Sequence, residues 1–227
     1  KFLSRKDAVK ELHFPQSLAR LEEAKRRLKF EELFYLQLRH LMLKGFRNRT
    51  YKGLVFDTVG KYFHEFYDNH LPFDLTGAQK RVLKEIRNDF KTGLQCNRLI
   101  QGDVGSGKTM VAMLSMLIAI DNGYQACMMA PTEILATQHF EGLREWVELL
   151  GLRMELLTGS TPKKKRELLL SDLLAGNIHI LVGTHALIEQ DVQYKQLGLV
   201  VIDEQHRFGV AQRAKLWKKG QVLPHIL

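Results

Sequence analysis

The segment from Gly102 to Thr109, GDVGSGKT, constrains this 227-residue chain more than any other. It fits the pattern G-x-x-x-x-G-K-[ST], in which glycines let successive backbone N–H groups converge on phosphate oxygens. Lys108 is predicted to reach the β- and γ-phosphates, and the Thr109 hydroxyl is predicted to bind Mg²⁺. The other loop residues predicted to contact phosphate are Gly102, Gly105, Ser106 and Gly107. The segment therefore predicts a site for a nucleoside triphosphate with Mg²⁺.

Apolar segments flank this loop on both sides. Residues 98–101 are predicted to form a buried strand that enters the loop, and residues 110–120 an apolar helix that leaves it. A helix that starts at the loop adds the positive end of its dipole to the anion site. A glycine-rich turn that binds nothing is the competing interpretation, and the strand–loop–helix order argues against it.

From residue 98 onward, the pattern alternates between short apolar strands and amphipathic helices. Strands are predicted at 98–101, 125–130, 153–157, 179–182 and 197–202, and further helices at 133–150 and 164–175. Strands that are apolar along their whole length are typical of a parallel sheet with both faces covered. The fold class is therefore α/β, with a parallel sheet and helices on both of its faces.

The residues before this sheet are predicted to be mainly helical. Helices are expected from Ser17 to about residue 44 with Gly45 as the stop, over 58–67, and over 77–91 with Thr76 as the cap, and an irregular basic connector over 46–56. Residues 1–98 hold 21 Lys and Arg against 12 Asp and Glu, whereas residues 99–227 hold 13 of each. A basic segment before a nucleotide loop suggests an anionic macromolecular partner, nucleic acid first. A solvated surface helix with spare lysines is the alternative.

Two carboxylates supply the second half of a nucleotide site. Asp203 and Glu204 follow the apolar strand at 197–202, and ligands of parallel sheets bind beyond the carboxyl ends of strands. Asp203 is predicted to orient Mg²⁺, and Glu204 to polarise the attacking water. With Lys108 they form the predicted catalytic set. The Asn-Lys-x-Asp guanine reader of GTPases does not occur in the sequence, so ATP is the expected nucleotide.

Other features restrict where the protein works. No apolar run reaches the length of a membrane span, so no membrane association is expected. Cys96 and Cys127 are the only cysteines and lack metal-ligand neighbours, which indicates no disulfide framework and a reducing cytoplasm. The sequence begins without an initiator Met, and we expect it to be part of a longer protein.

The residues after the carboxylate pair carry a family resemblance. The run Asp203-Glu204-Gln205-His206 resembles the motif II box of superfamily 2 helicases. Its continuation at 207–213 (RFGVAQR), with the loop at 102–109, APTEILA at 130–136 and GTHALI at 183–188, resembles the RecG family of bacterial replication-fork remodelling helicases. The Mfd translocases are similar but usually have Phe at the position of Ser106 and Asp-Glu-Glu-Gln in motif II, so the RecG family is preferred.

The resemblance implies a domain plan. Residues 1–70 would be a basic helical linker, similar through residues 24–33 to the one that joins the family's DNA-binding wedge to its motor. Residues 71–227 would be the first RecA-like ATP-binding domain. The family continues beyond 224–227 into a motif III strand and a second motor domain. We therefore expect a gap in the sheet unless these last residues fill it, weak nucleotide binding and negligible hydrolysis by this chain alone.

The resemblance also implies roles for single residues. Gln79 would read adenine, with Phe73 stacking on the base, and His206 would sense the γ-phosphate. The alternatives are a polar residue on an exposed helix face for Gln79, a core role for Phe73 and a structural role for His206. The residues implied to contact phosphates of the tracked DNA strand are Pro131, Thr132, Thr184 and His185. Thr132 is also a candidate cap for the helix at 133–150, and the two roles are compatible.

The function implied for the parent protein is ATP-driven remodelling of branched or forked DNA, such as stalled forks and Holliday junctions, by a monomeric helicase in recombination and repair. Two rivals within the same fold are a Mfd-like double-stranded DNA translocase and a nucleotide-switched interaction module without turnover. A third treats residues 1–98 as an autonomous DNA-binding module. Glu204 argues against the switch, because a switch has little need of a water-activating carboxylate.

Overall fold

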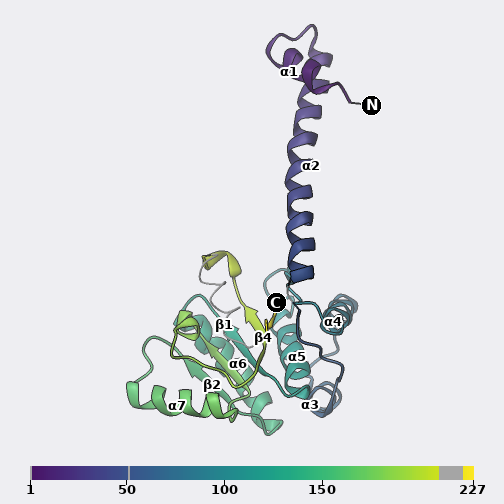
Figure 1. Ribbon diagram of the computed structural model, residues 1–227. Coiled ribbons are helices and arrows are strands. Elements are labelled where there is room, and N and C mark those ends of the chain that lie inside the picture. The colour runs from purple at the N-terminus through teal and green to yellow at the C-terminus, as the bar shows by residue number, and fades with distance from the viewer. Residues whose placement is uncertain (1, 51, 210–221) are drawn as a thin grey trace. The chain divides into compact units, whose positions relative to one another are not determined.

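The computed structural model describes residues 2–50, 52–209 and 222–227, with the side chains of 47–50 left out (Figure 1). The chain divides into two compact units, residues 1–50 and 51–227. No helix within the described ranges is long and apolar enough to cross a membrane.

The first unit consists of two helices, α1 (Arg5–His13) and α2 (Leu18–Thr50). The Ser4 hydroxyl caps α1 by accepting a hydrogen bond from the Asp7 backbone N–H at 3.1 Å. Ala8 of α1 and Ala24 of α2 are both fully buried, so the two helices pack closely through small side chains. Helix α1 was not predicted from the sequence.

The predicted end of α2 at Gly45 is wrong, because the helix continues to Thr50. Glycine ends a helix when it adopts a positive φ, and Gly45 does not. Here it lies inside the helix, where glycine costs about 1 kcal/mol relative to alanine. The predicted irregular connector at 46–56 is correspondingly shorter and starts only after Thr50.

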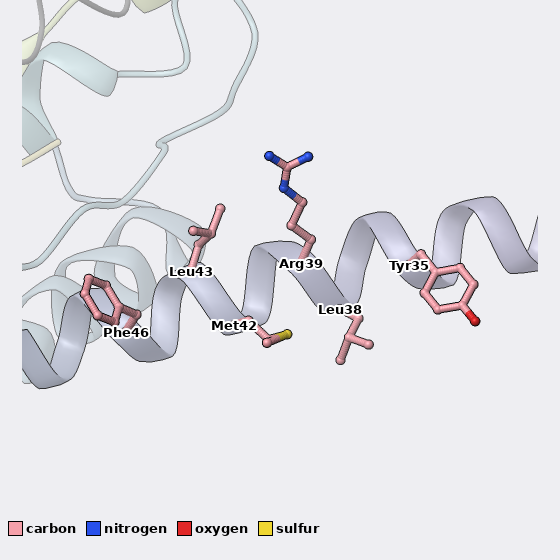
Figure 2. A pocket seen from close by; sticks show the side chains of 6 residues that line it. All are labelled: Tyr35, Leu38, Arg39, Met42, Leu43 and Phe46. Atoms are coloured by element: carbon pink, nitrogen blue, oxygen red, sulfur yellow. The ribbon is translucent and has the colours of Figure 1, made fainter.

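Helix α2 carries exposed apolar side chains along its second half. Figure 2 shows a shallow groove on this helix, in which Leu38 and Met42 project to one side and Arg39 and Leu43 to the other. Exposed apolar surface of this extent marks an interaction face in soluble proteins. The predicted packing of this stripe against a neighbouring domain stays a prediction.

The second unit is built on a five-stranded sheet that is parallel throughout. Its order is β2-β3-β1-β4-β5. The strands are β1 (Gln125–Met129), β2 (Met154–Leu157), β3 (Ile180–Gly183), β4 (Leu197–Ile202) and β5 (His225–Ile226). Among the described residues, the longer helices around it are α4 (Gly77–Phe90), α5 (Lys108–Asp121), α6 (Glu133–Leu149) and α7 (Lys163–Ala175). The shorter helices are α3 (Lys61–Glu65), the π-helix η1 (Phe66–His70) and the 3₁₀ helices η2 (His185–Ile188) and η3 (Gln205–Arg207).

Side chains alternate between two cores, one on each face of the sheet. Ala126 and Met128 of β1 lie in the core shared with α4, α5 and α6. Cys127 and Met129 of the same strand lie in the core shared with α7 and η2. This confirms the predicted class, an α/β fold with a parallel sheet covered on both faces and a mainly helical segment before it. Both cysteines are buried and free.

The predicted strand at 98–101 does not form. An isolated bridge at Asn97 pairs with β5, through Ile226 N–H to the Cys96 carbonyl and Arg98 N–H to the Ile226 carbonyl, at 2.9 and 3.0 Å. Leu99 is 65% exposed, so this segment lacks the burial that a strand interior needs. Strand β5, contributed by the last residues, fills the place beside β4 where a gap was expected.

The end of α5 anchors the segment that leads into α4. The Asp121 carboxylate accepts hydrogen bonds from the backbone N–H groups of Gly60, Tyr62 and Phe63 at 2.9, 3.0 and 3.1 Å. It thereby satisfies donors that the start of α3 leaves without helical partners. The predicted helix over 58–67 is replaced by α3 and η1, and residues 58–70 belong to the second unit.

Candidate nucleotide and DNA-strand site

The predicted phosphate loop lies directly before α5. Gly105 and Gly107 adopt positive φ angles of 79° and 78°, which residues with a Cβ rarely adopt. Gly107 is also the cap residue of α5. The Lys108 ammonium donates hydrogen bonds to the carbonyls of Gly102 and Asp103 at 2.7 and 2.8 Å. The loop thus has the predicted curled shape at a helix N-terminus, with the lysine lying across it.

Gln79 connects α4 to this loop. Its side-chain oxygen accepts from the Thr76 backbone N–H at 2.8 Å, and the Thr76 hydroxyl accepts from the Gln79 backbone N–H at 3.3 Å, a capping box. Its side-chain nitrogen donates to the Ser106 carbonyl at 2.9 Å. Both ends of the amide that was predicted to read adenine are therefore engaged within the protein. One N–H hydrogen and one lone pair are left for a ligand.

Phe73 lies close to Gln79 in sequence, before the cap of α4. Its side chain is 47% exposed and lines a surface hollow of about 350 Å³ with Tyr67 and Leu71. An aromatic ring with an open face can stack on a base. The exposure argues against the alternative core role, and stacking on adenine stays a prediction.

Asp203 directly follows β4, and a histidine holds its carboxylate. His139 Nε2 lies 2.9 Å from Asp203 Oδ2, with the two side chains 16% and 27% exposed. This hydrogen bond is the main cause that lowers the pKa of Asp203. Burial acts in the opposite direction, and the positive charge of Lys108 adds a smaller lowering. Asp203 is therefore an anion within the electrostatic reach of the phosphate-loop lysine.

The oxygen donors near the loop suit a magnesium ion. The Thr109 hydroxyl, at the start of α5, and the Asp203 carboxylate are hard ligands of the kind Mg²⁺ prefers, and Mg²⁺ on nucleotides takes few protein ligands. No group of three or more His, Cys, Asp or Glu that could hold a metal occurs among the described residues. Two oxygen donors suit an ion that completes its coordination with phosphate oxygens and water. Such an ion would neutralise phosphate charge as hydrolysis proceeds.

Glu204 adopts a left-handed backbone conformation, with φ at 51°, and caps η3. Its carboxylate lies 3.2 Å from His206 Nδ1, and both side chains are well exposed. Non-glycine residues in this conformation are strained, and such strain concentrates at functional sites. The pair brings the predicted water-activating residue and the predicted γ-phosphate sensor into direct contact.

The residues predicted to contact DNA follow two neighbouring strands, β1 and β3. Thr132 is exposed and caps α6 by accepting from the Leu135 N–H at 3.3 Å, so the capping role is present. His185 is exposed. Thr184 differs from the expectation, because its side chain is buried and its hydroxyl has no hydrogen-bond partner in the described parts of the chain. That hydroxyl is not presented to a strand at the surface. Pro131 is partly exposed beside Thr132.

His139 is the residue that the sequence reasoning missed. A signal for it existed in α6, where the buried residues Ala136, Leu143 and Val147 recur at helical spacing. His139 falls on the same stripe, three residues after Ala136, and a polar residue on a core-facing stripe needs a partner. Of the predicted motif at 207–213, residues 210–213 lie outside the described residues.

Comparisons with known proteins agree with this geometry. The model of the DEAD/DEAH box helicase family matches residues 76–224. The chain is 50% identical over 220 residues to the ATP-dependent DNA helicase RecG of Synechocystis sp. and 46% identical over 223 residues to that of Thermotoga maritima. These matches cover 97% and 98% of this chain but 26% and 28% of the relatives. The chain therefore spans about a quarter to a third of the curated relatives that it matches.

Solved structures give the same result. A structure of RecG bound to a three-way DNA junction matches with a TM-score of 0.82 and 43% identity, over 100% of this chain and 30% of that one. The yeast DEAD-box splicing factor Prp28 matches with a TM-score of 0.57 at 19% identity, over 72% of this chain and 42% of that one. That second likeness concerns the fold alone. The predicted resemblance to RecG is confirmed, and the chain belongs to the DEAD/DEAH box helicase family.

Proposed function

We propose that this chain is the linker and first motor domain of an ATP-dependent DNA helicase that remodels branched DNA in recombination and repair. The observation that carries the proposal is the geometry of the phosphate loop, in which Gly105 and Gly107 adopt positive φ angles at the start of α5 and Lys108 lies across the loop. A phosphate-binding lysine and a metal-binding carboxylate, here Asp203 directly after β4, form the minimum set for holding a nucleotide–Mg²⁺ complex. The matched family residues begin at 76, near the proposed start of the motor at 71.

Branched DNA is proposed as the substrate because of the relatives. One similar protein was solved on a three-way DNA junction. Within this chain, the loops at Pro131–Thr132 and at His185 follow adjacent strands, β1 and β3. They would contact phosphates, which positions a strand without reading its sequence. Residues 1–98 carry the whole basic excess, and this charge would add salt-dependent affinity.

The decisive experiment measures ATP hydrolysis by the longer parent protein with forked DNA, linear duplex or no DNA. We expect stimulation to be largest with forked DNA and to be lost in Lys108→Ala. Gln138→Ala, which changes an exposed uncharged residue of α6, should behave like the wild type. Equal turnover with and without DNA would contradict the proposal, and stimulation only by linear duplex would favour the Mfd-like alternative.

For this chain alone, we propose weak binding of ADP–Mg²⁺ and negligible turnover. The resemblance to RecG implies that an arginine of a second motor domain completes the site, and an arginine at the γ-phosphate can contribute about 10³–10⁵ in rate. Titration of a fluorescent ADP analogue tests the binding, and phosphate release with saturating DNA tests the turnover. DNA-stimulated turnover by the 227-residue chain that Lys108→Ala abolishes would show that the fragment is sufficient.

The nucleotide-switched module remains the rival from another class. It predicts that ATP changes the binding of a partner although no hydrolysis occurs in the longer protein. Glu204→Gln separates the two, because a motor loses turnover and keeps ATP binding, whereas a switch is unchanged.

We further propose that the parent works as a monomer in the cytoplasm, which the mass in solution and localisation of a tagged protein would test.

An autonomous DNA-binding module at 1–98 is less well supported. The Asp121 cap on α3 ties residues 60–63 to α5, and Leu83, Ile86 and Phe90 of α4 are buried in the same core as α5. A cut at residue 98 would therefore divide the second unit. Salt-dependent DNA binding is better measured on the whole chain, with paired charge reversals in α2.

A further inference from the structure

His139 occupies an unusual position for a histidine. Ala136, Leu143 and Val147 form the buried stripe of α6, and His139 lies within that stripe, between Ala136 and Leu143. Its side chain is 16% exposed. Helix α6 lies over the sheet in Figure 1, and the stripe belongs to the core on that face. An apolar residue at this position would extend the core without needing a partner.

The partner of His139 is the residue predicted to bind magnesium. The Nε2···Oδ2 distance to Asp203 is 2.9 Å, within the range of a strong hydrogen bond. An ionised carboxylate can only accept, so Nε2 carries the hydrogen and donates it. One oxygen of Asp203 is thereby held from the side of α6.

The backbone of Asp203 is fixed from another direction. Its N–H donates to the Met129 carbonyl at the end of β1, at 2.9 Å. With the backbone tied to β1 and one carboxylate oxygen tied to α6, the rotation of the side chain about its Cα–Cβ and Cβ–Cγ bonds is restricted. A carboxylate restricted in this way presents its remaining oxygen in one direction.

We propose that His139 is a positioning residue for Asp203, which orients the carboxylate for Mg²⁺ on a bound nucleotide. The role rests on the proposed function, since it presumes that Asp203 meets the metal. Groups that orient metal-binding carboxylates typically change metal affinity about 10–100-fold when removed. His139 does not touch the nucleotide or the reacting atoms.

The test compares two amide substitutions of His139 in the 227-residue chain. In His139→Gln the side-chain nitrogen reaches about as far as imidazole Nε2, so it can still donate to Asp203. In His139→Asn the shorter side chain places its nitrogen near the position of Nδ1, from which it cannot. Both are polar and of similar size, so a general effect of the substitution on folding is shared. Gln138→Ala, at the adjacent exposed position of α6, is the control.

The measurement is the Mg²⁺ concentration that gives half-maximal binding of a fluorescent ADP analogue, with a second titration in EDTA and a thermal unfolding curve. We expect His139→Asn to raise the Mg²⁺ midpoint about 10–100-fold. His139→Gln and Gln138→Ala should stay close to the wild type, and binding in EDTA should be the same in all four proteins.

Two results would overturn the role. A Mg²⁺ midpoint in His139→Asn that equals the wild-type value would show that Asp203 needs no such support. A parallel loss of stability and of binding in EDTA, with the midpoint unchanged, would show a structural ion pair only. Lys108→Ala distinguishes a failure of the nucleotide site itself from a failure of the positioning role. If the wild type binds the ADP analogue equally well with and without Mg²⁺, and Lys108→Ala binds it as tightly as the wild type, both the nucleotide site and the positioning role would be overturned.

Discussion

The side-chain amide of Gln79 joins the start of α4 to the phosphate loop, because its nitrogen donates to the Ser106 carbonyl at 2.9 Å. The same amide closes the capping box with Thr76. A Cβ on Gly107 would come within 2.3 Å of this nitrogen, so the loop and the amide are packed against each other. The position of the loop therefore depends on a residue that lies 27 positions earlier in the chain.

Gln79→Glu is expected to weaken nucleotide binding more than it weakens the fold. The new carboxylate can still accept from the Thr76 N–H, but it cannot donate to the Ser106 carbonyl, and its charge repels phosphates. We expect the dissociation constant for ADP–Mg²⁺ to rise about tenfold, the equivalent of one hydrogen bond of about 1.4 kcal/mol. Equilibrium titration measures this, with Lys80→Ala as the control.

Gln79→Ala additionally removes the side-chain oxygen that accepts from the Thr76 N–H in the capping box, so its free energy of unfolding should fall by about 1 kcal/mol. If Gln79 also reads adenine, both variants should lose the preference for ADP over GDP. Wild-type affinity and preference in Gln79→Glu would contradict both roles of the amide.

The Asp121 carboxylate is expected to be a large single contribution to the stability of the second unit. Asp121→Ala leaves three backbone N–H groups at the start of α3 without their acceptor, and we expect the free energy of unfolding to fall by about 3 kcal/mol. Asp121→Asn keeps one acceptor oxygen and should lose about half as much. Urea denaturation measures the change, and the exposed Asp57→Ala is the control. A loss in Asp121→Ala no larger than in the control would show that water replaces the cap.

The two thiols are expected to be inert in the folded protein. Burial raises the pKa of Cys96 to about 12 and that of Cys127 to about 12. The thiolate is the reactive form, so a shift from the ordinary value of 9.0 lowers its population about a thousandfold. A disulfide reagent at pH 8 should label both residues only after unfolding in guanidinium. Rapid labelling of either thiol in native buffer would show that the core around it opens.

Local patterns predicted most of the second unit. Helices α4, α5, α6 and α7 and strands β1 to β4 lie within a few residues of their predicted bounds, because each has a strong periodicity and a cap or turn at its ends. Thr76 and Thr132 cap their helices as their side-chain chemistry suggests. The phosphate loop and the carboxylates after β4 were recognisable because spacing alone defines them.

The errors arose where distant contacts decide the structure. Residues 98–101 have the composition of a buried strand, but the chain turns away after its short pairing with Ile226. Gly45 does not end the helix because its backbone does not adopt the positive φ that would turn the chain there. His139 was missed because its partner lies 64 residues later, and only the sheet brings the two together.

The stability of the sheet edge is expected to depend on pH through His225. This residue of β5 is fully buried between the rings of Phe56 and Phe90, with centroid distances of 4.8 and 4.6 Å. Its Nδ1 accepts a hydrogen bond from the Cys96 N–H at 2.9 Å. Burial lowers the pKa of His225 to about 4, from 6.5.

Because the folded-state pKa is the lower one, the unfolded chain takes up the proton first as the pH falls. The stabilisation is therefore complete above about pH 6.5 and is lost as the pH falls toward 4. The full shift corresponds to about 3 kcal/mol.

In His225→Asn the side-chain oxygen can accept from the Cys96 N–H as Nδ1 does, but it does not titrate. We expect the wild type to lose stability steeply between pH 6.5 and 4 in urea denaturation, and His225→Asn to show a much shallower slope. Burial also lowers the pKa of His179, so a residual slope should remain in His225→Asn and fall further in the double variant His179→Asn, His225→Asn. Identical slopes in the wild type and His225→Asn would show that β5 leaves the sheet before His225 takes up its proton.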